Sequence, residues 1–255
     1  MDTAPTTPPR RSRSGGPHLG ALAIVSAALT LLGLIVGFAL AGGQAFISPF
    51  SGADAVAAYA QQHWLSIRVV SMIQFGSAVP LGIYAATAYA RLLRLGVRVP
   101  GPGIGFFGGI TASVMLMISA LGSYVLSRPD VSSDPTIALA LTFFTFITGG
   151  VGFVTGMGLL IAGIAVPSLI LGFVPRWLAW TGLVIAALSE LSFLSMAIEP
   201  LQFLLPIGRF GGLLWLVAVG FLLPNDRREV RRESATHDDD AAADTVAQRT
   251  EADLS

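Results

Sequence analysis

Glu190 is the residue whose type and position give this sequence its best opportunity for chemistry. It lies about thirteen residues into an apolar segment near 177–198. An acidic side chain inside a bilayer costs on the order of 2.5 kcal/mol or more, so it must face protein or a cavity. Gly182 and Ala186 precede it at four-residue spacing, which puts all three on one helix face. We therefore expect Glu190 to point into a helix bundle.

Three other polar residues are expected near the same end of that bundle. Arg68 and Gln74 fall toward the outer end of the second apolar segment, and Arg209 falls in the first turn of the last one. In one interpretation, these residues and Glu190 line an outward-opening pocket for a small anionic or zwitterionic ligand, or for a proton. In the other, an arginine neutralises Glu190 and only ties the helices together. Arg209 is the preferred partner, because a short connection packs the last two helices antiparallel.

Other reactive side chains are scarce. The sequence has no cysteine and three histidines, His18, His63 and His237, none of them deep in an apolar segment. No H-E-x-x-H, G-x-S-x-G or Walker pattern occurs, and the glycine-rich run 101–109 follows no strand-like segment. The sequence therefore predicts no catalytic residue, no metal site and no cofactor, and a membrane enzyme is the least favoured function.

The composition predicts the surroundings in which these residues act. Hydrophobic residues make up 53% and charged residues 12% of the 255 residues, with a mean hydropathy of +0.73. Soluble proteins carry about 25% charged residues, and about 20 apolar residues suffice for a helix to cross a bilayer. We predict an all-α polytopic membrane protein, a compact six-helix transmembrane bundle surrounded by lipid bilayer, with no nucleic-acid partner.

Six apolar segments account for the bundle. They lie near residues 20–42, 66–90, 104–126, 136–166, 177–198 and 206–224. The fourth is ambiguous, because the 41 residues between Asp134 and Arg176 carry no charge and could hold one long helix or two.

The arginines decide between these topologies. With six helices, twelve arginines fall on one side of the membrane and three on the other. Arginine-rich loops face the cytoplasm, so both termini are expected there. The domain prediction is a disordered cytoplasmic tail over 1–18, a transmembrane domain over 19–224 and a polar, largely disordered cytoplasmic tail over 225–255.

Stripes of small residues run along one face of several of these segments. Gly152 and Gly156 belong to one of them, and such stripes let helix backbones approach closely in lipid. The stripes could form a dimer surface or pack within the chain. We favour packing within the chain and expect both glycines to touch another helix.

Four stretches carry a resemblance to a known family. They are VPRWLAWTGLVIAALSELS (174–192), PIGRFGGLLWLVAVGFLLP (206–224), QFGSAVPLGIYA (74–85) and LSRPDV (126–131). Together they resemble an uncharacterised family of bacterial six-helix membrane proteins, defined as a domain of unknown function, over roughly residues 20–224. The resemblance implies a bacterial plasma-membrane location and six helices. It implies no activity, cofactor or site.

The sequence leaves the function open between two main classes. The first is a non-enzymatic membrane protein that binds a small ligand, a partner membrane protein or further copies of itself. The second is a transporter or substrate-capturing subunit with an outward-facing polar pocket around Glu190. A transporter of this size often shows internal symmetry between its two halves, and here only the small-residue stripes repeat.

Overall fold

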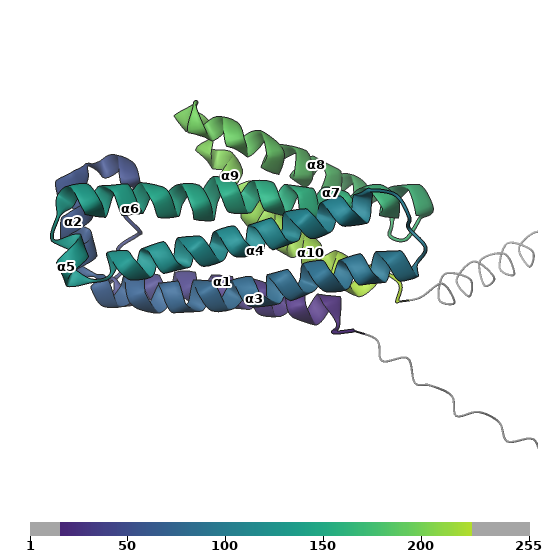
Figure 1. Ribbon diagram of the computed structural model, residues 1–255, viewed down its shortest axis with the longest axis horizontal. Coiled ribbons are helices and arrows are strands. Elements are labelled where there is room, and N and C mark those ends of the chain that lie inside the picture. The colour runs from purple at the N-terminus through teal and green to yellow at the C-terminus, as the bar shows by residue number, and fades with distance from the viewer. Residues whose placement is uncertain (1–15, 226–255) are drawn as a thin grey trace, which may run out of the picture.

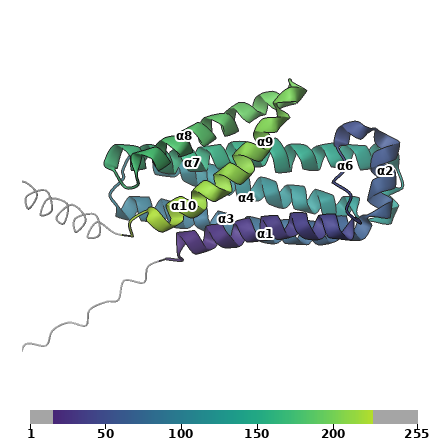
Figure 2. The ribbon, with the colours of Figure 1, turned by 180° about the vertical axis from the view of Figure 1, so that it is seen from behind.

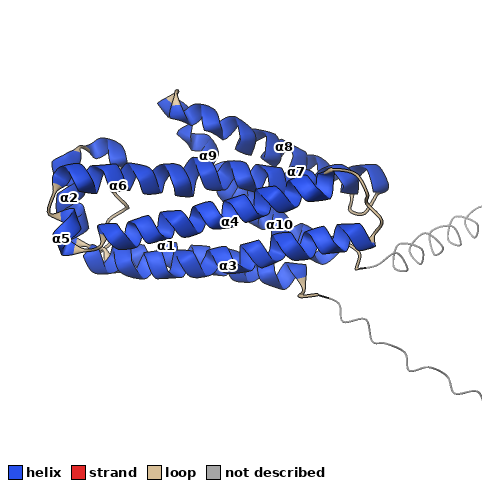
Figure 3. Ribbon diagram, viewed as in Figure 1, coloured by secondary structure: helices blue, strands red, loops and turns tan. Residues whose placement is uncertain are grey.

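The computed structural model describes residues 16–225, and within that range the chain consists of helices joined by short loops and turns, with no strand. Six helices are long and apolar enough to cross a membrane, and they pack side by side into one elongated bundle (Figures 1 and 3). This confirms the predicted all-α, six-span membrane architecture. The predicted disordered tails lie almost entirely outside the described residues.

The six spans alternate in direction along the chain. Three are simple helices: α1 (Leu19–Leu40), α3 (Trp64–Arg94) and α4 (Gly101–Leu126). The fourth runs without a break through α6 (Pro135–Ile147), the π-helix η2 (Thr148–Gly152) and α7 (Phe153–Leu171). The fifth joins α8 (Arg176–Leu191) to η3 (Ser192–Met196). The sixth comprises η4 (Glu199–Phe203), α9 (Leu204–Pro206), the π-helix η5 (Ile207–Gly211) and α10 (Gly212–Leu222).

The fourth span resolves the ambiguity that the uncharged stretch leaves open. It is one helix of 37 residues, Pro135–Leu171. Asp134 caps its start by accepting hydrogen bonds from the backbone N–H groups of Thr136 and Ile137. At about 1.5 Å per residue, this helix is longer than a bilayer core is thick. It is therefore long enough to extend past the bilayer core.

The first turns of this helix support a small cap at one end of the bundle. The segment 43–64, in which the hydrophobic pattern predicts no span, folds into η1 (Pro49–Ser51) and α2 (Ala53–Gln62). We call residues 49–62 the α2 cap. Its apolar side packs on the ends of three spans, around Ile67, Leu126 and Ala138. The short helix α5 (Pro129–Ser132) lies beside it (Figure 1).

The opposite end of the bundle holds both ends of the described chain, Gly16 and Asn225 (Figures 1 and 2). There α1 and α10 pack closely, because a Cβ on Gly220 would lie 2.6 Å from the backbone nitrogen of Gly20. The Tyr84 hydroxyl donates to the carbonyl of Leu216 across the same half. Toward the α2 cap, α1 and the last span diverge (Figure 2). One half of the bundle is thus closed and the other is not.

Small residues bring α4 and α7 together as expected. A Cβ on Gly156 would lie 2.6 Å from the backbone nitrogen of Ala112, and one on Gly152 would lie 3.1 Å from the Met115 side chain. Both glycines therefore touch another helix of the same chain, which confirms that prediction. Close backbone approach at small residues is the usual way in which helices associate in lipid.

Candidate functional site

A cavity of about 490 Å³ lies in the open half, between the spans and the α2 cap. Ligand pockets in proteins are typically about 300–1,000 Å³, so its size suits a small organic molecule. Its wall comes from α1, α2, α3, α4, α6, η2, α7, η4, α9 and η5, and from residues 46–49. Most of the side chains in that wall are apolar, and Arg209 is the one charged side chain among them.

Arg209 reaches the cavity from the π-helix η5. Its Nη2 donates to the carbonyl oxygen of Gly149 at 2.7 Å, and its guanidinium carbon lies 4.8 Å from the centroid of the Phe153 ring. Gly149 itself belongs to the other π-helix, η2. The hydrogen bond therefore joins two π-helical segments from different spans.

Paired glycines stand in or beside both π-helices: Gly149 and Gly150 in η2, and Gly211 and Gly212 where η5 passes into α10. A π-helical turn changes the backbone hydrogen bonding, and such turns are frequent at functional sites. A Cβ at Gly149 would lie 2.3 Å from the Ser119 hydroxyl oxygen, so only glycine fits at this contact. The glycines let α4 approach η2 and leave the Gly149 carbonyl available to Arg209.

A chain of hydrogen bonds extends the polar end of the cavity. The Gln74 side-chain Nε2 donates to the Ser119 hydroxyl at 3.2 Å, and that hydroxyl donates to the Thr145 carbonyl at 2.9 Å. Gln74, Ser119, Thr145 and Arg209 all line the cavity. We call these four side chains, together with the Gly149 carbonyl, the Arg209 cluster.

No carboxylate among residues 16–225 pairs with Arg209. Within residues 16–225, the one ion pair is Arg128–Asp130, at 3.9 Å, between side chains that are 51% and 89% exposed. The Nε and Nη1 atoms of Arg209 donate to no residue in the described part of the chain. A half-buried cation with free donors, in a cavity otherwise without charge, suits an anion. Arginine is well shaped for this, because its planar fork matches a carboxylate or phosphate.

Glu190 does point inward, but it does not meet Arg209. Its Oε1 packs against α7, where a Cβ on Gly158 would lie 2.8 Å away. This oxygen is buried without a hydrogen-bond partner among the described residues, and Glu190 does not line the cavity. The expected Glu190–Arg209 pairing is therefore wrong. The π-helix η5 turns Arg209 toward η2 and α7, whereas Glu190 on α8 contacts a different part of α7.

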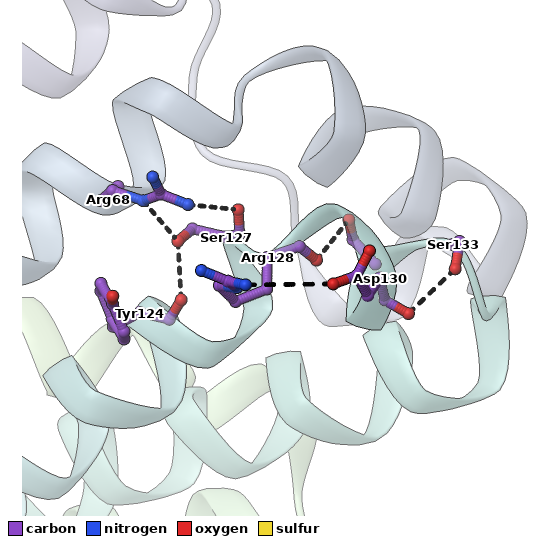
Figure 4. A network of polar contacts seen from close by, with 7 residues as sticks. Arg68, Tyr124, Ser127, Arg128, Asp130 and Ser133 are labelled. Atoms are coloured by element: carbon purple, nitrogen blue, oxygen red, sulfur yellow. Dashed lines mark hydrogen bonds and ion pairs between the residues drawn. The ribbon is translucent and has the colours of Figure 1, made fainter.

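Arg68 also lies away from the cavity wall. Its Nε donates to the Ser127 hydroxyl at 3.3 Å and its Nη2 to the Ser127 carbonyl at 3.4 Å, as Figure 4 shows. Its guanidinium also stacks on the rings of Trp64, at 4.8 Å, and Tyr124, at 5.8 Å. These contacts tie α3 to the end of α4. Of the four predicted ligand-binding residues, the structure brings only Gln74 and Arg209 together.

The end of the cavity beneath the α2 cap is uncharged and mostly apolar, with the Tyr59 hydroxyl as a buried polar group that has no hydrogen-bond partner among the described residues. The Tyr59 ring lines it beside Val56 and Ile67. The Tyr59 side chain is 8% exposed, and burial raises the pKa of its phenol, so this group stays neutral. The Tyr59 ring also stacks on His63, with centroids 4.6 Å apart. The cavity therefore has one polar, cationic end and one mostly apolar end.

Sequence reasoning missed several members of this site. Ser119 gave no signal, because one serine in an apolar helix is common, and Thr145 and Gly149 read as packing residues. The usable signal was the paired glycines within two spans, a pattern that allows π-helical turns. The described residues contain no group of three or more metal-ligating side chains.

Comparison of the chain with protein-family models, with curated proteins and with solved structures gives no match. The geometry of the site alone must therefore support any functional assignment.

Proposed function

We propose that this chain is a membrane-embedded binding protein for a small organic anion, which Arg209 holds in the cavity beneath the α2 cap. The observation that carries the proposal is the Arg209 guanidinium, which lines an otherwise uncharged cavity without a carboxylate partner among the described residues. Burying an unpaired charge is costly, so an anion that pairs with it gains that free energy on binding. Gln74 and Ser119 add neutral hydrogen-bonding groups at the same end.

Binding is favoured over passage through the bundle, because the half away from the cavity is closed. There α1 and α10 are in backbone contact at Gly20 and Gly220, and Tyr84 bridges α3 to α10. Transport would require these helices to separate. The resemblance to a bacterial membrane family stays a prediction and assigns no ligand.

We further infer that both termini are cytoplasmic and that the cavity lies in the outer half of a bacterial plasma membrane. The inference is supported by the even number of spans and by four arginines near the end that holds Gly16 and Asn225. Those arginines are Arg91, Arg94, Arg98 and Arg176. Arginine-rich ends face the cytoplasm.

The test compares octanoate with octan-1-ol, which have the same chain length and differ in charge. Thermal unfolding of the full-length protein in detergent is measured with each compound. We expect octanoate to raise the melting temperature more than octan-1-ol does. In Arg209→Gln this difference should vanish, because a hydrogen bond to a charged group contributes about 1.5–3 kcal/mol.

Arg128→Gln is the matched control, since Arg128 is half-exposed at the same end of the bundle and outside the cavity. Its response should equal that of the wild type. Arg209→Lys should keep part of the response, because it retains the charge without the planar fork. An equal effect of octanoate on wild type and Arg209→Gln would refute the proposal.

A further inference from the structure

The cavity separates its polar and apolar residues along its length. Three spans each line it over a stretch of eight residues: Ile67 to Gln74 on α3, Ser119 to Leu126 on α4, and Thr142 to Gly149 on α6 and η2. At about 1.5 Å per residue this is about 10 Å of wall on each helix. On α3 the polar residue lies at the deep end and the apolar one beneath the α2 cap. On α4, Ser119 and Leu126 follow the same order. The third wall differs, because Thr142 lies at its cap end, where its hydroxyl donates to the Ala138 carbonyl of the same helix.

The deep end holds the Arg209 cluster, with its cation and neutral donors. The cap end is enclosed by Ile47, Val56, Tyr59, Ala60 and Leu126, which belong to or pack on a separate apolar core beneath α2. An anion with no hydrophobic part would leave this end empty. An alkyl chain suits this end, because it passes from lipid into another apolar environment and stays away from water.

The opening of the cavity is apolar as well. Leu34 of α1 and Phe210 of η5 both line the cavity and are 43% and 41% exposed, and Phe46 is 49% exposed. Leu34 and Phe210 belong to spanning helices, so their exposed surfaces face lipid. The two spans that carry these residues, α1 and the last span, diverge toward the α2 cap (Figure 2). A ligand that comes through this opening comes from the bilayer rather than from water.

From this arrangement we infer that the ligand is a single-chain amphipathic anion of the fatty-acid type, taken up sideways from the bilayer. Its charged group binds at Arg209 and its alkyl chain runs toward the α2 cap. The inference rests on the proposed function and adds the ligand class, the route and the direction of the chain. This direction is the reverse of that of the lipids in the outer leaflet. Those lipids have their heads at the membrane surface and their tails toward the middle of the bilayer, whereas the bound ligand has its head deep and its tail toward the surface.

The reversed orientation makes the inference testable by photolabelling. The probe is decanoate with a diazirine at its terminal carbon, added to full-length protein in phosphatidylcholine nanodiscs. After irradiation, mass spectrometry maps the labelled peptides. We expect label in residues 43–62, which include the α2 cap. A probe oriented like the surrounding lipid would instead label exposed apolar residues near mid-span, such as Leu31 or Ile35 of α1.

Arg209→Gln should lower the label in residues 43–62 by about tenfold or more, the effect of losing one charge-assisted hydrogen bond. Arg128→Gln should leave it unchanged. Arg209→Lys, which keeps the charge, should retain part of it and guards against a folding defect in Arg209→Gln. An excess of unlabelled decanoate or of lysophosphatidic acid should compete. The stronger competitor identifies a carboxylate or a phosphate head, and competition by decanol of equal strength would overturn the requirement for an anion.

The outcomes separate this inference from the proposed function. Label that depends on Arg209 but lies on α1 or near η5, away from the α2 cap, would overturn the chain direction and leave anion binding intact. Label in residues 43–62 that is equal in the wild type and in Arg209→Gln would overturn the inference, because Arg209 would then not bind the charged head of the probe. No label above background, together with no octanoate effect on melting, would overturn both.

Discussion

At the residue scale, two ionisable side chains inside the spans have opposite surroundings. Arg209 lines a cavity, donates to one carbonyl and keeps two further nitrogens free of described partners. Glu190 places one oxygen against α7 at Gly158, where it has no hydrogen-bond partner among the described residues. The sequence ranks Glu190 first, because a carboxylate deep in an apolar helix is conspicuous. The structure places Arg209, which the sequence puts in the first turn of a helix, in the wall of the cavity.

This difference predicts that Glu190→Gln leaves folding intact. The amide is close in size to the carboxylate and carries no charge, so it costs less to bury against α7. We expect the melting temperature in detergent to be unchanged or higher, and the octanoate effect to be retained. Glu199→Gln, at the exposed start of the sixth span, is the matched control. A lower melting temperature would indicate a contact that needs the charge, and lost octanoate binding would return Glu190 to the site.

At the element scale, glycines set which helices touch and where a helix changes its geometry. The three- and four-residue spacing of small residues was enough to predict that α7 packs within the chain, because that spacing defines one helix face. The same spacing could not predict the π-helices η2 and η5. These depend on how two spans meet, and Gly149 takes part through its contact with Ser119 on α4. Two of the five members of the Arg209 cluster were therefore predictable, Gln74 and Arg209. The others, Ser119, Thr145 and the Gly149 carbonyl, were not.

The packing of α4 against α7 gives a graded stability prediction. In Gly156→Ala the new Cβ would lie 2.6 Å from Ala112 N and 2.8 Å from Gly108 O, both backbone atoms. Overpacking of this kind costs about 1–3 kcal/mol, because the helices must move apart. Gly152→Ala should cost less, since the side chain of Met115 can move. Denaturant unfolding in detergent measures the difference.

Gly103 provides the control within α4, because a Cβ there has nothing within 4 Å. Gly103→Ala should be neutral or stabilising, since alanine is better than glycine in a helix by up to about 1 kcal/mol. Equal losses at positions 103 and 156 would contradict the prediction, because they would show that the close approach of α4 and α7 at Gly156 does not set the cost of the substitution.

At the scale of the whole molecule, the bundle is asymmetric from end to end. The end with Gly16 and Asn225 is sealed by backbone contact between α1 and α10, whereas the other end holds the cavity under the α2 cap. Hydropathy and charge were enough to predict six spans, because crossing lipid demands long apolar helices. They could not predict the α2 cap. Its residues are neither long nor apolar enough to form a span, and it is held by contacts with Ile67, Leu126 and Ala138, which are distant in sequence.

The last prediction concerns which end of the bundle faces the cytoplasm. Six spans put residue 130, in α5, and residue 235, after the last span, on opposite sides of the membrane. The arginine distribution puts residue 235 in the cytoplasm. A reporter that is active only in the periplasm should therefore give signal when fused after residue 130 and none when fused after residue 235. A reporter that is active only in the cytoplasm should give the reverse, which controls for expression. Signal from both fusions with one reporter would refute six spans. Exchanged signals would keep the six spans and move the cavity to the cytoplasmic half, where its ligand would come from the inner leaflet.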